Sequence, residues 1–119
     1  MKKILVVEDD EVGRELVRMT LERDGYVVVT AEDGERGFEA ALAERPDLII
    51  TDVYMPAADG VHLVRRVRST PELASTPILV TTGFGTGSAT LTLAQGADAY
   101  EPKPLDPEAL RETVRRLLS

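Results

Sequence analysis

The chain has 119 residues, of which 43% are hydrophobic and 29% charged, as expected for a single globular domain. It contains no cysteine, which excludes disulfides, thiolate nucleophiles and zinc–sulfur sites. The formal net charge of −7 argues against nucleic-acid binding by this chain, because contacts with a phosphate backbone need a basic surface. No apolar stretch approaches the roughly 18 residues of a membrane span, and the first apolar run is too short for a secretory signal. We therefore expect a cytoplasmic protein that binds no membrane.

Strand-like and helix-like patterns alternate along the chain. Apolar or β-branched runs predict strands at 4–7, 26–30, 48–51, 78–82 and 99–101. Apolar residues at helical spacing predict helices over 12–23, 34–45, 61–68 and after Asp106, which we expect to cap the last helix before Pro107. The first of these helices carries its apolar residues at Val12, Leu16, Met19 and Leu21. A further short, threonine-rich helix is expected near Ser88, after a glycine-rich stretch at 83–87.

Repeated strand–helix units predict an α/β fold with a parallel sheet and helices on both faces. Pro102 and Pro104 each remove a backbone donor, so the fifth strand should lie at an edge or end there. These features favour a flavodoxin-like (βα)5 three-layer sandwich with strand order 2-1-3-4-5. In this order ligands bind where the carboxyl ends of strands one and three meet. Those ends carry acidic residues, namely Glu8, Asp9, Asp10 and Asp52.

The acidic residues predict a cation site. Considered alone, Asp52 could simply cap the turn that follows its strand. Several carboxylates in one pocket, however, repel one another unless a cation joins them. Without cysteine, and with the single histidine His62 expected on a helix surface, an all-oxygen site suits Mg²⁺. Lys103 and Thr82 should open toward the same edge, and a cation, a hydroxyl and Mg²⁺ around one aspartate form a clamp for a phosphoryl group.

The segments ILVVEDD, DVYMPAADG, PILVTTG and AYEPKP resemble, in this order, the motifs of receiver domains of two-component response regulators. The resemblance covers essentially the whole chain and implies one receiver domain over residues 1–119. It implies that Asp52 accepts a phosphoryl group from a histidine kinase or a histidine phosphotransfer protein. Mg²⁺ would be bound by Glu8, Asp9, Asp52 and the backbone carbonyl of Tyr54, with Asp10 just outside the site.

The same resemblance implies how the phosphorylated state is formed, read and lost. Lys103 and Thr82 would assist the transfer, and Lys103–Pro104 is a candidate for a cis peptide bond. Thr82 and Tyr100 would relay the state to the face formed by helix 4, strand 5 and helix 5. Tyr54 and Phe84 occupy positions where the family tunes dephosphorylation. Their rings predict a comparatively long-lived phosphorylated state, unless both point to solvent or pack against helix 4.

Two other functions compete with this one. A Mg²⁺ phosphohydrolase or a nucleic-acid-processing domain on a similar sheet would carry a second acid where Tyr54 stands. A docking module that no longer accepts phosphate is disfavoured by the joint presence of Glu8, Asp9, Asp52, Thr82 and Lys103. We expect no enzyme in the usual sense, only Mg²⁺-dependent self-phosphorylation from small donors and self-dephosphorylation. The sequence leaves open the cognate kinase, the effector protein or output domain, a phosphorylation-dependent dimer, and whether this is a single-domain regulator or a part of a longer protein.

Overall fold

The computed structural model describes residues 1–53, 60–83 and 96–119, with only the main chain described at Thr82. Tyr54, Phe84 and the helix expected near Ser88 lie outside these ranges. The elements follow in the order β1 (Lys3–Val7), α1 (Glu11–Glu22), β2 (Val27–Ala31), α2 (Gly34–Glu44), β3 (Leu48–Asp52), α3 (Gly60–Arg68), β4 (Ile78–Thr82), β5 (Ala99–Pro102) and α5 (Pro107–Leu118). None of the helices in the described ranges is both long and apolar enough to cross a lipid bilayer.

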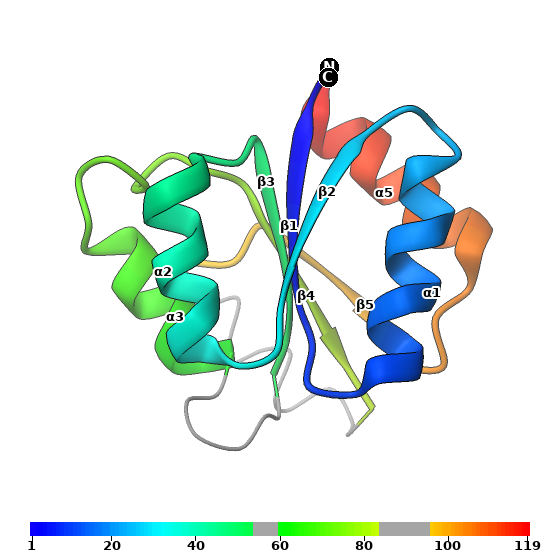
Figure 1. Cartoon of the computed structure of the whole chain (residues 1–119), viewed down its shortest axis with the longest axis horizontal. Helices are drawn as coiled ribbons and strands as arrows, with labels where there is room; N and C mark the ends of the chain where they lie inside the picture. Colours follow the sequence, from blue (N-terminus) through cyan, green and yellow to red (C-terminus); the bar gives the residue numbers. More distant parts are fainter. Residues whose placement is uncertain (54–59, 84–95) are drawn as a thin grey trace.

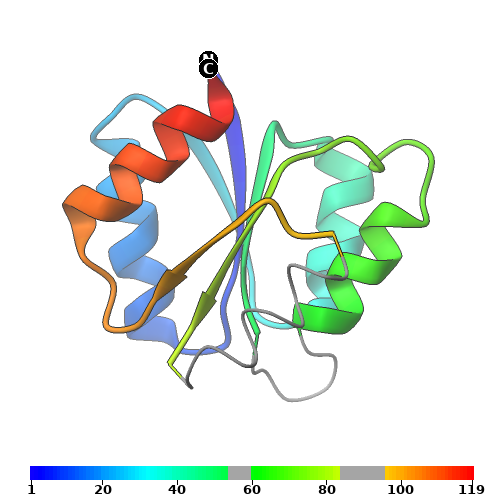
Figure 2. The same cartoon turned by 180° about the vertical axis from the view of Figure 1, so that it is seen from behind.

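The five strands form one parallel sheet in the order β2-β1-β3-β4-β5, which confirms the predicted flavodoxin-like topology. Helices α1 and α5 cover one face of this sheet, and α2 and α3 cover the other, so the molecule has three layers (Figure 1). Seen from behind, β5 forms the outer edge beside β4 (Figure 2). It ends at Pro102, and an edge strand tolerates the missing donor of a proline, as the sequence predicted.

The central strands β1 and β3 are buried on both faces, which explains why the sequence shows them as continuous apolar runs. Their side chains alternate between two hydrophobic clusters. Leu5 and Ile49 pack with residues of α2 and α3. Ile4 and Ile50 pack with residues of α1 and α5 on the opposite face. Both strands are therefore anchored in the core up to the point where the acidic residues begin.

Helix α1 was predicted correctly, but its buried face is not the one that its apolar pattern suggests. Leu21 is fully buried together with Val17. Val12, Leu16 and Met19 are instead 77%, 51% and 49% exposed. These three residues form a second apolar stripe one turn apart on the outer side of α1, which we call the outer α1 face.

Aspartates cap the described helices that follow β1, β2 and β5. The side chain of Asp10 accepts a hydrogen bond from the Gly13 amide at 2.8 Å, and Asp33 accepts one from the Arg36 amide at 2.8 Å. Asp106 caps α5 with Pro107 in its first turn, as predicted. Other element boundaries differ by about one residue from the predicted ones. For example, β2 begins at Val27 and α3 at Gly60, where the sequence predicted starts at residues 26 and 61.

Candidate functional site

Three carboxylates meet at the carboxyl edge of the central strands. Glu8 and Asp9 follow β1, while Asp52 ends β3. The two strands pair in parallel with Val7 opposite Thr51, so the residues after them leave the sheet side by side. One carboxylate oxygen from each of the three residues lies within 4.8 Å of the other two. Glu8 and Asp52 are each 6% exposed and Asp9 is open to solvent, so this acidic cluster could hold a metal ion that enters from the Asp9 side.

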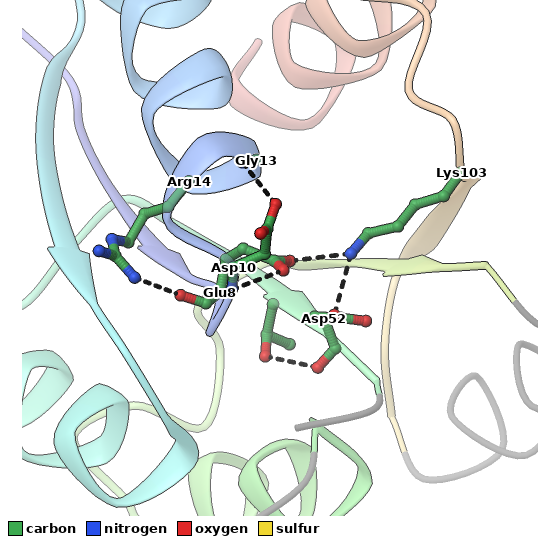
Figure 3. A network of polar contacts seen from close by, with 7 residues as sticks. Glu8, Asp10, Gly13, Arg14, Asp52 and Lys103 are labelled. Carbon is green, nitrogen blue, oxygen red and sulfur yellow. Dashed lines mark hydrogen bonds and ion pairs between the residues drawn. The ribbon is translucent and has the colours of Figure 1, made fainter. Parts of the chain in front are cut away.

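Lys103 reaches the acidic cluster from the segment after β5. Its ammonium nitrogen lies 3.0 Å from Glu8 Oε2 and 2.9 Å from Asp52 Oδ2 (Figure 3). Because β4 separates β3 from β5, the lysine side chain must extend past the end of β4 to make these contacts. The following Lys103–Pro104 peptide bond is cis, as the resemblance implied.

The charges of this site shift the pKa values of Glu8 and Lys103. Burial raises the pKa of Glu8, the nearby Asp52 charge raises it further, and hydrogen bonds from Lys103 and the Asp10 amide oppose the shift without cancelling it. Burial by itself would lower the pKa of Lys103, but its hydrogen bonds to Asp52 and Glu8 outweigh this effect and raise it. Lys103 therefore stays cationic, and within the described residues one ammonium faces three carboxylates. The excess negative charge favours a second cation.

The main chain at Asp52 is fixed on two sides. The hydroxyl of Thr51 donates to the Asp52 carbonyl at 3.0 Å, and the Gly60 amide donates to the Val53 carbonyl at 2.9 Å. A Cβ atom at Gly60 would lie 2.1 Å from the Asp52 carbonyl oxygen. Only glycine allows α3 to start this close to the end of β3, which accounts for the glycine at position 60.

The other residues expected at the site are placed as follows. Thr82 ends β4 at the same edge of the sheet, although its side chain is not described. Tyr100 lies on β5 with 37% of its surface exposed. His62 is on the exposed side of α3, in agreement with its expected surface position. The structure therefore brings together Glu8, Asp9, Asp52 and Lys103, while Tyr54 and Phe84 are outside the described ranges.

One residue near the site, Arg14, was missed by the sequence reasoning, and Asp10, which was expected just outside the site, also caps a helix, a role that was not predicted. Arg14 donates through Nη1 to the backbone carbonyl of Glu8 at 2.9 Å. Asp10 caps α1 with its side chain, and its amide donates to Glu8 Oε1 at 3.2 Å. The position of Asp10 directly before a helical pattern was a usable signal for a cap. The contact of Arg14 left no comparable signal, because its acceptor is a backbone carbonyl.

Comparisons with known proteins agree with this geometry. Residues 4–115 match the family model described as the response regulator receiver domain. The chain is 40% identical over 115 residues to the transcriptional regulatory protein CseB of Streptomyces coelicolor, covering 97% of this chain and 48% of CseB. It is also 40% identical over 118 residues to the alkaline phosphatase synthesis transcriptional regulatory protein PhoP of Bacillus subtilis, covering 98% of this chain and 48% of PhoP. The chain thus spans about half the length of the curated relatives it matches.

Solved structures show the same fold over nearly the whole chain. The chemotaxis protein CheY4 of Vibrio cholerae matches with a TM-score of 0.93 and 38% identity, covering 99% of each chain. A putative response regulator from Chloroflexus aurantiacus matches with a TM-score of 0.94 and 35% identity, covering 98% of this chain and 97% of the other.

Proposed function

The chain belongs to the response regulator receiver domain family of two-component systems, and from this premise we propose that Asp52 is its phosphoacceptor. The observation that carries the proposal is the cluster in which Lys103 joins Asp52 to Glu8, with Asp9 beside them. We propose that residues 1–119 form one receiver domain. Its donor would be a histidine kinase or a histidine phosphotransfer protein.

In the proposed transfer, a carboxylate oxygen of Asp52 forms a bond to phosphorus while the bond from phosphorus to the donor's histidine nitrogen breaks. Lys103 already contacts Asp52 Oδ2 at 2.9 Å, so its ammonium can follow a phosphoryl oxygen as the acyl phosphate forms. The hydroxyl of Thr82 would donate to another phosphoryl oxygen. The acyl phosphate is lost when water attacks phosphorus, which makes the chain a self-limiting switch rather than an enzyme with a separate substrate.

The acidic cluster fits Mg²⁺, because its ligands are carboxylate oxygens and because three of them converge within 4.8 Å. Asp9 and Asp52 would bind the ion with the Tyr54 backbone carbonyl, and Glu8 would contribute mainly through water. When bound, Mg²⁺ neutralises the charge that gathers on the phosphoryl oxygens.

Asp9→Ala should therefore abolish Mg²⁺-dependent phosphorylation in a folded protein, and normal labelling of that variant would contradict the metal assignment.

We propose that the outer α1 face receives the phosphodonor protein. Its residues Val12, Leu16 and Met19 are exposed, and α1 begins directly after the acidic cluster. A hollow of about 210 Å³ connects Leu16 to the site and is lined by Asp10, Gly13, Leu16, Lys103, Pro104 and Leu105. A donor protein must present its phosphorylated histidine to Asp52, so an apolar surface bordering the site is well placed to hold it.

Leu16→Glu should slow transfer from a histidine kinase that phosphorylates the unmodified chain, while labelling by acetyl phosphate stays within about twofold.

The phosphorylated state would be recognised at β5, the edge strand of the sheet. Tyr100 is partly exposed there, with 37% of its surface open. We propose that Thr82 and Tyr100 relay the state to the face of helix 4, β5 and α5, where an effector protein, an output domain or a second phosphorylated copy binds. An output domain is supported by the relatives named as transcriptional regulatory proteins, of which this chain matches about half.

Mass spectrometry of the intact chain after treatment with acetyl phosphate and Mg²⁺ tests the central proposal. The unmodified chain should gain one phosphoryl group, and Asp52→Asn should gain none. Asp106→Asn is the matched control, because it makes the same substitution at another aspartate while asparagine still caps α5. Labelling of Asp52→Asn, or no labelling of the unmodified chain, would overturn the assignment of Asp52.

A further inference from the structure

We propose that Arg14 is a positioning residue that aims the acidic pair Glu8–Asp9 at the metal position. The proposal rests on the function proposed above and concerns how this chain prepares its own cation site. Arg14 lies in the first turns of α1, where its guanidinium turns back and donates to the Glu8 carbonyl at 2.9 Å. Figure 3 shows Glu8 held between Arg14 on one side and Lys103 on the other.

The hydrogen bond acts on the main chain rather than on a carboxylate. The Glu8 carboxylate is already engaged, since Oε1 accepts from the Asp10 amide at 3.2 Å and Oε2 accepts from Lys103 at 3.0 Å. The carbonyl that Arg14 binds belongs to the peptide group joining Glu8 to Asp9. Fixing that peptide plane fixes the N–Cα bond of Asp9 and so restricts the direction in which its side chain leaves the backbone.

The chain leaves the sheet at this point and needs such a restraint. The Glu8 amide still follows the sheet, because it donates to the Ala31 carbonyl of β2 at 3.1 Å. Two residues later, Asp10 is fixed as the cap of α1. Asp9 lies between these two anchors and is exposed, so its direction depends on the two peptide groups that flank it: Arg14 binds the carbonyl of the one before it, and Glu8 Oε1 accepts from the amide of the one after it.

Ligand direction matters more for Mg²⁺ than for larger ions. Mg²⁺ requires near-octahedral geometry with oxygens at about 2.0–2.1 Å. Groups that orient metal ligands without touching the metal typically change affinity by about 10- to 100-fold when removed. Arg14 holds such a place relative to Asp9, which we expect to be a direct ligand.

If Arg14 acts through its charge, its removal should change the Mg²⁺ affinity in the opposite direction from the change expected if it acts by positioning. A cation near a metal site repels the metal, so a role through charge would make Mg²⁺ bind more tightly when the guanidinium is removed. A positioning role makes Mg²⁺ bind more weakly. The sign of the change in affinity therefore separates the two effects.

The experiment is a Mg²⁺ titration of the whole chain followed by the amide NMR signals of residues 8–10, 52 and 53. Arg14→Met should weaken Mg²⁺ binding about tenfold, and Arg14→Lys should recover part of the loss because it retains a donor. Arg18→Met is the matched control. It removes the same charge from the same helix, where Arg18 pairs with Glu15 and Glu22, and it should leave the affinity within about twofold.

A second measurement distinguishes positioning from general destabilisation. In labelling by acetyl phosphate, Arg14→Met should raise the Mg²⁺ concentration for half-maximal rate about tenfold, while the rate at saturating Mg²⁺ changes less than about twofold. If Arg14→Met does not fold by circular dichroism, Arg14→Gln and Arg14→Lys replace it, with the expected affinity order Arg, Lys, Gln. Unchanged or tighter Mg²⁺ binding in folded Arg14 variants overturns the inference alone. Failure of the unmodified chain to bind Mg²⁺ overturns both this inference and the proposed function.

Discussion

Two polar clusters lie at opposite ends of the sheet, and each is centred on one cationic side chain. At the carboxyl ends of β1 and β3, Lys103 contacts Glu8 and Asp52. At the amino ends of β4 and β5, Arg68 donates to Asp98 at 2.8 Å and to three backbone carbonyls, those of Ala74, Thr76 and Gly96. The first cluster contains the proposed site, while the second joins α3 to the starts of two strands.

The two clusters differ in their balance of charge. Among the described residues Arg68 meets a single carboxylate, and Asp98 Oδ2 also accepts the Ile78 amide at 2.8 Å, so charge and hydrogen bonds are matched. Lys103 shares its charge among carboxylates that outnumber it, and the pKa of Glu8 is raised by burial and by Asp52. A balanced cluster stabilises the fold without needing a further ion. An unbalanced one leaves an unfavourable interaction that a bound cation can relieve, which is the property expected of a binding site.

The largest effect should follow from breaking the balanced cluster. Arg68→Ala leaves Asp98 and several carbonyls without their donor, and should lower the free energy of unfolding by about 2–4 kcal/mol. Arg65→Ala removes the same charge from an exposed position on the same helix and should change stability by less than about 0.5 kcal/mol. Urea unfolding of both variants measures the difference. Equal losses in the two variants would contradict a structural role for the Arg68 cluster.

A smaller loss should follow from removing the cation of the unbalanced cluster. Lys103→Met should lower metal-free stability by about 1–2 kcal/mol, because two hydrogen bonds to charged groups disappear and Glu8 and Asp52 are left facing each other. Mg²⁺ should restore part of this loss. Lys3→Met, which removes a surface pair with Glu44, is the control and should cost less than about 0.5 kcal/mol with or without Mg²⁺. A loss at Lys103 that Mg²⁺ does not reduce would be evidence against a shared cation site.

The sequence predicted the unbalanced cluster far better than the balanced one. Glu8, Asp52 and Lys103 are charged residues at strand ends, and the strand order by itself brings those ends to one edge. Arg68 binds mainly backbone carbonyls, and any residue can supply a carbonyl, so no pattern of side chains could reveal its cluster. The same reason explains why the contact between Arg14 and the Glu8 carbonyl was missed.

Helix α1 shows a second limit of sequence patterns. Val12, Leu16 and Met19 follow helical spacing, and so do Val17 and Leu21. Spacing alone predicts the helix correctly in either case, but it does not decide which stripe faces the sheet. The packing of β1 against α1 makes that choice, and it leaves the first stripe exposed.

Neutralising one acid of the unbalanced cluster should stabilise the metal-free protein. Because the pKa of Glu8 is raised in the folded state, the native protein binds more protons than the unfolded chain above the unfolded pKa of about 4.3. The cost of ionised Glu8 is therefore absent below that pH and grows as pH rises toward the folded pKa. Glu8→Gln should gain about 0.5–1 kcal/mol at pH 7 in EDTA, and the gain should vanish near pH 4.

Urea unfolding between pH 4 and pH 7 measures this gain. Glu44→Gln is the control, since Glu44 pairs with Lys3 on the surface and should show no gain at neutral pH. If Glu8→Gln is less stable than the unmodified chain at pH 7 without metal, the unbalanced cluster does not carry the cost assigned to it.

The smallest predicted effect concerns a second matched ion pair, the one between Arg111 and Asp24. Arg111 of α5 binds Asp24 with two hydrogen bonds of 2.8 Å and also contacts Glu108 at 2.8 Å. The hydrogen bond from Arg111 lowers the pKa of Asp24, so the pair adds stability above the unfolded pKa of about 3.9 and loses it as pH falls through the folded pKa.

The side chain of Asp24 is 19% exposed, whereas that of Glu108 is 82% exposed. Asp24→Asn should therefore lower the urea midpoint slightly at pH 7 and by a smaller amount at pH 3, and at pH 7 the change should be smaller than that in Glu8→Gln. Glu108→Gln on the same arginine should change neither midpoint, because a solvated partner adds little. A loss at Glu108 that matched the loss at Asp24 would show that the number of contacts to Arg111, rather than their shielding from water, determines the stability that the pair provides.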